Sequence, residues 1–96
     1  MAAIYTLGIA SKLVELHPRT IMNYEKLGFL KAERTPTNQR RFSNKNLQTL
    51  LLLKYLREEE KLNLSAIKLI LRNNLVSSLF PNFDADKRLQ EILAEV

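Results

Sequence analysis

Four residues in the first third of the chain have the spacing of one helix face and the chemistry of base recognition. They stand at positions i, i+3, i+4 and i+7: Arg19, Met22, Asn23 and Lys26. Arginine and lysine donate hydrogen bonds to guanine O6 and N7, and asparagine pairs with adenine N6 and N7 in the major groove. Taken alone, the pattern fits either a base-reading face or a solvated helix face.

A second basic group follows around a turn-forming sequence, Thr35-Pro36-Thr37-Asn38. It consists of Arg34, Arg40, Arg41 and Lys45. Turn formers between two short segments predict a β-hairpin over residues 30–42. Arginines on such a hairpin can reach the phosphates that flank a groove. A helix with a base-reading face, followed at once by a basic hairpin, favours DNA binding over a merely solvated surface.

The remaining polar residues give little support for catalysis or metal binding. His17 is the only histidine and stands where a helix N-cap is expected, which favours a capping or surface role. The chain has no cysteine, so Cys-ligated metals and thiol redox sensing are excluded, and a metal site would rest on scattered carboxylates. With only Gly8 and Gly28, no Gly-rich phosphate loop is present. We therefore expect neither an enzyme nor a cofactor.

The net charge of +5 lies entirely in the first half of the chain. Residues 1–46 carry eight basic and three acidic groups, whereas residues 47–96 carry seven of each. An excess confined to one half suits a polyanion-facing module joined to a neutral packing module. The basic residues do not fall on one long amphipathic helix, as membrane binding would require. No basic leader with a long apolar run is seen, so we expect a cytoplasmic, nucleoid-associated protein without a membrane partner.

Two short helices and the hairpin are predicted to position the basic groups. Thr6 suits the N-cap of a helix through Val14, because the apolar residues between them share one face. Pro18, preceded by His17, starts a second helix that ends near Leu27, where Gly28 is the expected C′ residue. Its apolar face, with Ile21, Tyr24 and Leu27, would dock on the first helix. Two helices joined by a tight connection predict a helix-turn-helix.

The second half is predicted to be helical. Ser43 suits the cap of a third helix from Asn44 to about Lys61, and Asn63 or Ser65 can start a fourth. After a break at 80–82, a last helix begins near Asp84. The third helix is apolar almost all the way round, so something must cover its far side. Either the fourth helix and the tail cover it, or a second protomer does.

Several short motifs follow one another over residues 4–72. They are Tyr5-Thr6-Leu7-Gly8, Pro18-Arg19-Thr20-Ile21, Tyr24-Glu25-Lys26-Leu27-Gly28-Phe29-Leu30, Arg34, Arg40-Arg41-Phe42-Ser43 and Leu64-Ser65-Ala66-Ile67-Lys68. In this order and spacing they resemble the DNA-binding domain of the MerR family of bacterial winged helix-turn-helix transcriptional regulators. Within the family, the His17-Pro18-Arg19-Thr20 entry, the wing exit at residues 40–43 and Leu62-Asn63-Leu64 are most similar to the heat-shock repressor (HspR-like) branch.

The resemblance implies a mainly α fold: a winged helix-turn-helix with a short β-hairpin wing, two further helices and a short C-terminal helix. It implies a DNA-binding domain over residues 1–75 and a C-terminal segment, 76–96, that could serve as a dimerisation helix. Arg19 would read bases or nearby phosphates, Tyr24 would hydrogen-bond a phosphate while its ring packs inward, and the wing arginines would hold the backbone. The DNA-binding residues so implied are Pro18, Arg19, Thr20, Asn23, Tyr24, Lys26, Arg34, Arg40, Arg41 and Lys45.

The chain departs from the family pattern at four positions. The family usually has arginine where Met22 stands and an aromatic at Asn23, so the reading face is altered and the operator sequence cannot be copied from relatives. Glycine is common where Glu15 and Asn38 stand. Asparagine tolerates the left-handed conformation, whereas glutamate would be strained by roughly 1 kcal/mol if its φ is positive.

The function expected from these observations is a sequence-specific transcriptional regulator that acts as a dimer on promoter DNA. Its expected partners are double-stranded DNA, a second copy of the chain and, as an option, a protein co-regulator; effector binding within the chain is not expected. An architectural or excisionase-like DNA-binding or adaptor protein that uses the same winged module is the alternative. Surplus leucines of the third helix and the tail stripe would form the dimer: Leu52, Tyr55, Leu89, Ile92, Leu93 and Val96.

Overall fold

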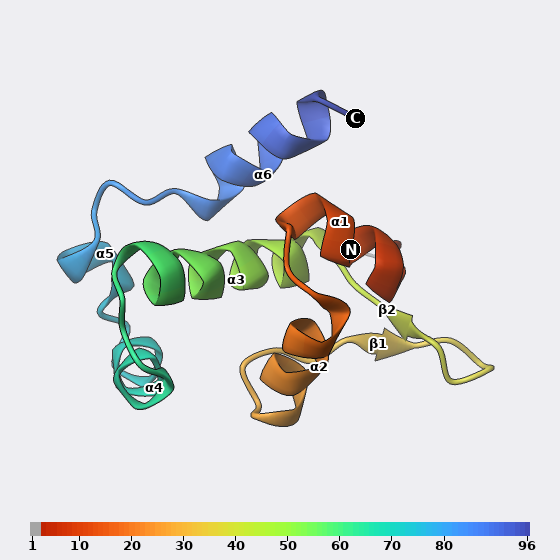
Figure 1. Ribbon diagram of the computed structural model, residues 1–96, viewed down its shortest axis with the longest axis horizontal. Helices are drawn as coiled ribbons and strands as arrows, with labels where there is room; N and C mark the ends of the chain where they lie inside the picture. Colours follow the sequence, from red (N-terminus) through yellow and green to blue (C-terminus); the bar gives the residue numbers. More distant parts are fainter. Residues whose placement is uncertain (1–2) are drawn as a thin grey trace.

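The computed structural model describes residues 3–96 and shows a helical chain with one β-hairpin (Figure 1). In chain order the elements are α1 (Leu7–Val14), α2 (Pro18–Lys26), β1 (Glu33–Arg34), β2 (Arg40–Arg41), α3 (Asn44–Lys54), a π-helical turn (Tyr55–Glu59), α4 (Leu64–Arg72), α5 (Val76–Leu79) and α6 (Ala85–Ala94). The sequence predicted the first two helices, the hairpin wing and the helices of the second half, except for the π-helical turn and α5. The mainly α winged helix-turn-helix fold is therefore confirmed. None of the helices within residues 3–96 is both long and apolar enough to cross a membrane.

Side chains that accept hydrogen bonds from free backbone N–H groups set the starts of the first three helices. Thr6 Oγ1 accepts from the Ile9 amide at 3.2 Å, as the sequence predicted. Ser43 and Asn46 exchange hydrogen bonds in a full capping box at the start of α3. His17 Nδ1 accepts from the Arg19 amide at 3.0 Å, which confirms its capping role. The lone histidine thus holds the first turn of α2 in place.

The turn between α1 and α2 is held by hydrogen bonds to its backbone atoms. Glu15 has φ 54° and ψ 48°, the left-handed conformation that the sequence predicted to be strained. Its amide bonds back to the Ser11 carbonyl, which closes α1. Lys54 Nζ, from the end of α3, donates to the carbonyl oxygens of Val14 at 3.1 Å and Glu15 at 3.3 Å. The angle between the two helices is therefore set partly by α3.

The wing is a short antiparallel ladder with two residue pairs, Glu33 with Arg41 and Arg34 with Arg40. Its turn contains Asn38 at φ 65°, whose amide bonds to the Thr35 carbonyl at 2.8 Å. The wing is joined to the rest of the chain by Phe42, a fully buried side chain that pairs through its backbone with Tyr5. Few ladder bonds hold the wing itself, so its direction depends on contacts at its base.

Helix α3 is the centre of the core. Leu47, Leu50 and Leu53 are fully buried along it, and Leu56 of the following π turn is fully buried as well. Figure 1 shows α6 lying along α3 on the side opposite α2 and the hairpin, and Leu89 of α6 is also fully buried. The sequence left two options for covering the far side of this apolar helix: the tail of the same chain or a second protomer. Within the single molecule, the tail covers it through α6.

The end of α3 differs from the prediction of one helix to about Lys61. Regular α geometry ends at Lys54, and the next turn is π-helical, with the Glu60 amide bonded to the Tyr55 carbonyl at 3.1 Å. Tyr55 stacks on Phe83 with ring centroids 4.4 Å apart and contacts Phe80 edge to face at 5.9 Å. These contacts fasten the tail to the π turn. The short helix α5 was not predicted, because its four residues are too few to show a periodic pattern.

A charged pair lies at the same junction between the π turn and the tail. Arg88 of α6 lies over the Phe83 ring at 5.0 Å and bonds Glu59 Oε2 through Nη1 at 3.0 Å. Both partners of the ion pair are about half exposed, with side-chain exposures of 42% and 55%, so the pair itself contributes little. The aromatic stack with Phe83 is therefore the main contact at this point.

Candidate nucleic-acid interface

Three elements lie on the side of α3 that is opposite α6 (Figure 1). In Figure 1, α2, the β1–β2 hairpin and α4 all lie below α3, whereas α6 lies above it. Most of the basic residues that the sequence singled out belong to the first two of these elements, and Lys45 belongs to α3. One face of the molecule thus carries the predicted reading helix with the wing on one side and the start of α4 on the other.

The exposed face of α2 is polar and basic, as predicted. Arg19, Asn23 and Lys26 are exposed, whereas Ile21 is fully buried and Tyr24 is only 6% exposed. Met22 lies on the outward face and is 39% exposed, so it offers a thioether and methyl group in place of a hydrogen-bond donor. The prediction for Leu27 was wrong. It caps the end of α2 and is 38% exposed, because the chain leaves the helix at this residue toward Gly28.

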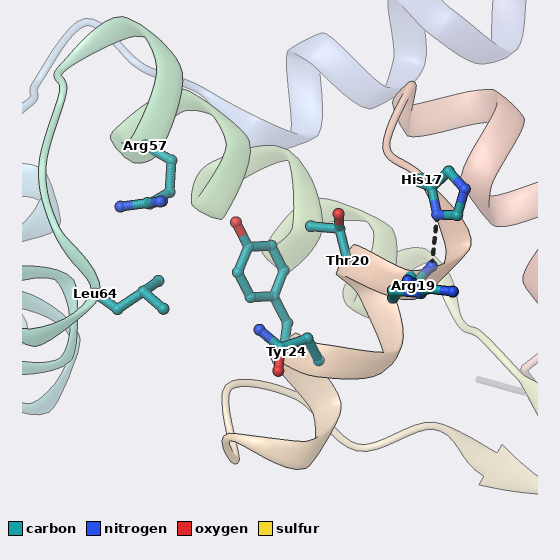
Figure 2. A pocket seen from close by; sticks show the side chains of 7 residues that line it. His17, Arg19, Thr20, Tyr24, Arg57 and Leu64 are labelled. Atoms are coloured by element: carbon teal, nitrogen blue, oxygen red, sulfur yellow. Dashed lines mark hydrogen bonds between the residues drawn. The ribbon is translucent and has the colours of Figure 1, made fainter.

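An open cavity of about 740 Å³ lies between α2 and the segment that joins α3 to α4 (Figure 2). Its lining brings together four of the predicted DNA-binding residues with three others: Arg19, Thr20, Asn23 and Tyr24 with His17, Arg57 and Leu64. Arg57 comes from the π turn, and its Nη1 donates to the Leu62 carbonyl at 3.2 Å. Arg57 was missed from the sequence, because a regular helix through residue 61 gave no reason to place it beside α2.

Tyr24 combines a buried ring with a hydroxyl that reaches the cavity. Its ring packs edge to face on Phe29 at 5.9 Å, and Figure 2 shows the hydroxyl pointing across the cavity toward the segment that carries Arg57. Burial raises the pKa of Tyr24 above its ordinary value of 10.0, and the positive charge of Arg57 partly offsets this. The phenol therefore keeps its proton at neutral pH and can donate a hydrogen bond to an anion.

A second open cavity, of about 510 Å³, lies between α2 and the wing. It is lined by Arg19, Met22, Asn23, Glu25, Lys26, Arg34 and Arg40. Glu25, one of these lining residues, accepts hydrogen bonds from Arg40 Nε at 2.7 Å and from the Ala32 amide at 3.1 Å. Two of the wing arginines, Arg34 and Arg40, thus lie beside the exposed face of α2, together with an acidic residue that was not singled out.

The carboxylate of Glu25 is held in its charged form. Partial burial opposes ionisation, but hydrogen bonds from Arg40 and the Ala32 amide, together with the charges of Arg40 and Arg34, outweigh it and lower the pKa of Glu25. Arg34 Nη2 lies 3.9 Å from the same carboxylate. Two arginines therefore share one glutamate at the base of the wing.

The other predicted contact residues lie further out on the same chain segment. Arg41 bonds the Arg40 carbonyl and Gln39 through its guanidinium and lines a hollow beside the first turn of α1. Lys45 is exposed in the first turn of α3, in a separate hollow with Ser43, Asn44 and Gln48. Pro18 is half-buried at the start of α2. None of these three lines either cavity beside α2.

Comparison with known proteins decides which family this surface belongs to. The sequence model of the MerR helix-turn-helix family of regulatory proteins matches residues 5–74. The chain belongs to the MerR family. It is 34% identical over 77 residues to the putative heat shock protein HspR of Streptomyces coelicolor, a match that covers 79% of this chain and 51% of that protein. The predicted family is confirmed, and this relative bears the name of the heat-shock branch that the sequence resembles.

A solved MerR structure has the same arrangement of elements. HiNmlR, a MerR family regulator lacking the sensor domain, was crystallised bound to promoter DNA; it matches this chain with a TM-score of 0.69 and 29% identity. The match covers 95% of this chain and 74% of HiNmlR. The chain spans about half the length of the curated HspR relative.

The residues predicted to form a MerR-type dimer are largely used within the single chain. Leu89 is fully buried, and Leu52, Tyr55, Ile92 and Leu93 are partly buried against the same core. Val96, in contrast, is 85% exposed at the end of the segment. Dimerisation through this stripe stays a prediction, and Val96 is its most exposed member.

Proposed function

We propose that this MerR family chain is a sequence-specific DNA-binding regulator of transcription that acts on promoter DNA as a dimer and has no enzymatic activity. One observation carries the proposal: the exposed polar face of α2 lies between two arginine-lined cavities. The major groove is about 12 Å wide and is bordered by phosphates on both sides. A reading helix flanked by cationic groups on both sides matches that pattern.

The proposed roles follow from the placement of each side chain. Arg19, Asn23 and Lys26 are exposed on α2 and face base edges, where their donors and the asparagine amide find partners. Tyr24 and Arg57 hold phosphates on one side of the groove, since a protonated phenol and a guanidinium both donate to phosphate oxygens. Thr20 lines the cavity that holds Tyr24 and Arg57 and acts on their side of the groove. The wing residues Arg34, Arg40 and Arg41 hold the backbone on the other side, and Pro18 and Lys45 are proposed as further backbone contacts.

A dimer would double these contacts. The two α2 helices would enter successive major grooves about 34 Å apart, which requires an operator with two related half-sites. Its surface would include Val96 and the partly buried residues of α6 and α3. The neutral charge of residues 47–96 suits such a contact, because two copies would not repel one another there.

The experiment that tests the proposal separates reading from holding. The preferred operator is first selected by the wild-type protein from a pool of random duplexes. The affinities of Arg19→Ala and Arg41→Ala are then measured on this operator and on a random duplex at one salt concentration. We expect Arg19→Ala to lose about 1–3 kcal/mol on the operator and far less on random DNA. Arg41→Ala should weaken both by similar factors.

Three outcomes would contradict the proposal or redirect it. The absence of DNA binding at low salt would end it. Loss of specificity in Arg41→Ala with none in Arg19→Ala would remove α2 as the reading element. A monomer that binds long DNA cooperatively without a preferred site would favour the architectural function instead.

A further inference from the structure

An acidic residue in the middle of a DNA-facing surface calls for an explanation, and Glu25 is such a residue. It lies on α2 between Tyr24 and Lys26, and its side chain lines the cavity between α2 and the wing. Its negative charge opposes phosphate, so on charge alone the chain would bind DNA better without it. The geometry of its carboxylate gives it another role.

Both oxygens of the carboxylate are engaged with the wing, and the side chain is only 14% exposed. Oε2 accepts from the backbone amide of Ala32, which directly precedes β1, at 3.1 Å. Oε1 accepts from Arg40 Nε in β2 at 2.7 Å and lies 3.9 Å from Arg34 Nη2 in β1. One side chain of α2 therefore contacts both strands of the wing.

The manner in which Arg40 is held leaves its outer donors free. Arginine has five N–H donors, of which Nε supplies one. Within residues 3–96, the hydrogen bond of the Arg40 guanidinium is made through Nε, and the two Nη groups have no protein partner. Its side chain is 26% exposed, so these four N–H groups can meet a phosphate while the inner edge stays on Glu25.

The wing needs such a contact because its own ladder is short. Two residue pairs join its strands, and a two-stranded hairpin is marginally stable by itself. Phe42 anchors the end of the wing in the core, and Glu25 ties its base to the last turn of α2. Without Glu25, Arg34 and Arg40 would lose their shared partner, and the orientation of the wing relative to α2 would no longer be fixed.

We propose that Glu25 is a positioning residue that sets the distance between the base-reading face of α2 and the phosphate-binding arginines of the wing. This inference rests on the proposed function, since it concerns how one surface fits two features of DNA at once. A duplex whose phosphates and bases meet both groups in the correct register is then favoured over a random duplex. Glu25 thus contributes specificity at the expense of general affinity.

The proposal predicts a change in specificity that a simple charge effect does not produce. Removing any acidic group from this face raises the affinity for all DNA, because the net positive charge grows. Removing Glu25 should also lower the ratio of operator to random affinity. Glu33 supplies the matched control: it is exposed on β1, pairs with Arg41 in the ladder and lies on the same wing.

The experiment compares Glu25→Gln with Glu33→Gln on the selected operator and on a random duplex. Both variants should bind random DNA more tightly than the wild type by similar factors. Only Glu25→Gln should lower the operator-to-random ratio, by about tenfold, the factor that corresponds to losing one hydrogen bond between charged groups. Arg40→Lys keeps the charge of the wing but lacks the Nε donor, and it should lower the ratio to a similar extent.

A double variant separates the contact from the charge. In an Arg40→Ala background, Glu25→Gln should change the ratio less than it does in the wild-type background, since the Arg40 partner is already absent and only the contacts with Ala32 and Arg34 remain. Equal ratios for Glu25→Gln and Glu33→Gln in the wild-type background would overturn the inference. So would an unchanged ratio in Arg40→Lys. If the wild type itself shows no preferred operator, it is the proposed function that fails.

Discussion

The left-handed conformation of Glu15 predicts that replacing it with glycine stabilises the protein. Glu15 joins α1 to α2 at φ 54° and ψ 48°, where the Cβ of an L-residue crowds the following carbonyl. Its contacts in the turn are made by backbone atoms: the amide bonds Ser11, and the carbonyl accepts from Lys54. Glycine keeps both contacts and removes the crowding.

The expected gain is the difference between two terms. Relief of the left-handed strain is worth about 1–2 kcal/mol, and the added freedom of glycine in the unfolded chain costs about 0.5–1 kcal/mol. The net gain in the free energy of unfolding is about 1 kcal/mol. For a domain of this size, about 1 kcal/mol raises Tm by about 4–8 °C. The ratio of operator to random affinity should not change, because the Glu15 side chain lines neither cavity beside α2.

Thermal unfolding followed by circular dichroism measures the gain, with urea unfolding as a second measurement. Glu15→Ala is the matched control, because it removes the carboxylate but keeps the Cβ atom. It should leave Tm almost unchanged. Equal stabilisation by alanine and glycine would show that charge, not backbone strain, is the cause. A lower Tm for Glu15→Gly would refute the reasoning altogether.

Four further results are expected. Leu89→Ala should lower the free energy of unfolding by about 2–5 kcal/mol in urea, because this fully buried side chain seals α3, whereas Val96→Ala should have almost no effect. Because the pKa of Glu25 is lowered in the folded state, its contribution to stability is complete above its ordinary pKa of 4.5 and is lost as the pH falls through the folded-state value; Glu25→Gln should flatten this part of a plot of Tm against pH. Sedimentation equilibrium should give twice the chain mass, reduced by Val96→Asp, and a monomer in both cases would remove the dimer. Log affinity for DNA should fall against log salt with a slope of roughly −7 if each protomer of the dimer neutralises about four phosphates; a flat dependence would exclude phosphate contacts.

The elements set by local chemistry could be predicted from the sequence. Thr6, His17 and Ser43 cap helices where they were expected to, because an N-cap needs only a side-chain acceptor within three residues of free amides. Asn38 supplies the left-handed residue of the wing turn for the same kind of local reason. The exposed face of α2 also follows from its spacing alone.

The parts that depend on distant contacts could not be predicted. Arg57 lies beside Tyr24 because the chain changes from α to π geometry after Lys54, and a helix drawn at 100° per residue does not show that change. The role of Glu25 depends on where the wing folds back on α2, and its spacing of fifteen residues from Arg40 carries no periodic signal. The packing of α6 on α3 was left as one of two options, since an apolar stripe does not identify its partner.

The contact of Lys54 with the turn between α1 and α2 has a consequence for how the motif tolerates sequence change. The ammonium group meets the carbonyl oxygens of Val14 and Glu15, and every amino acid supplies such an oxygen. Substitutions within the turn therefore keep the hydrogen bonds from Lys54, and residues other than glycine are tolerated there. A substitution at position 54, forty residues away from Val14, would loosen the turn while every residue of α1 and α2 stays the same. A screen for variants that lose helix-turn-helix geometry should accordingly find Lys54 outside the motif and few positions inside the turn itself.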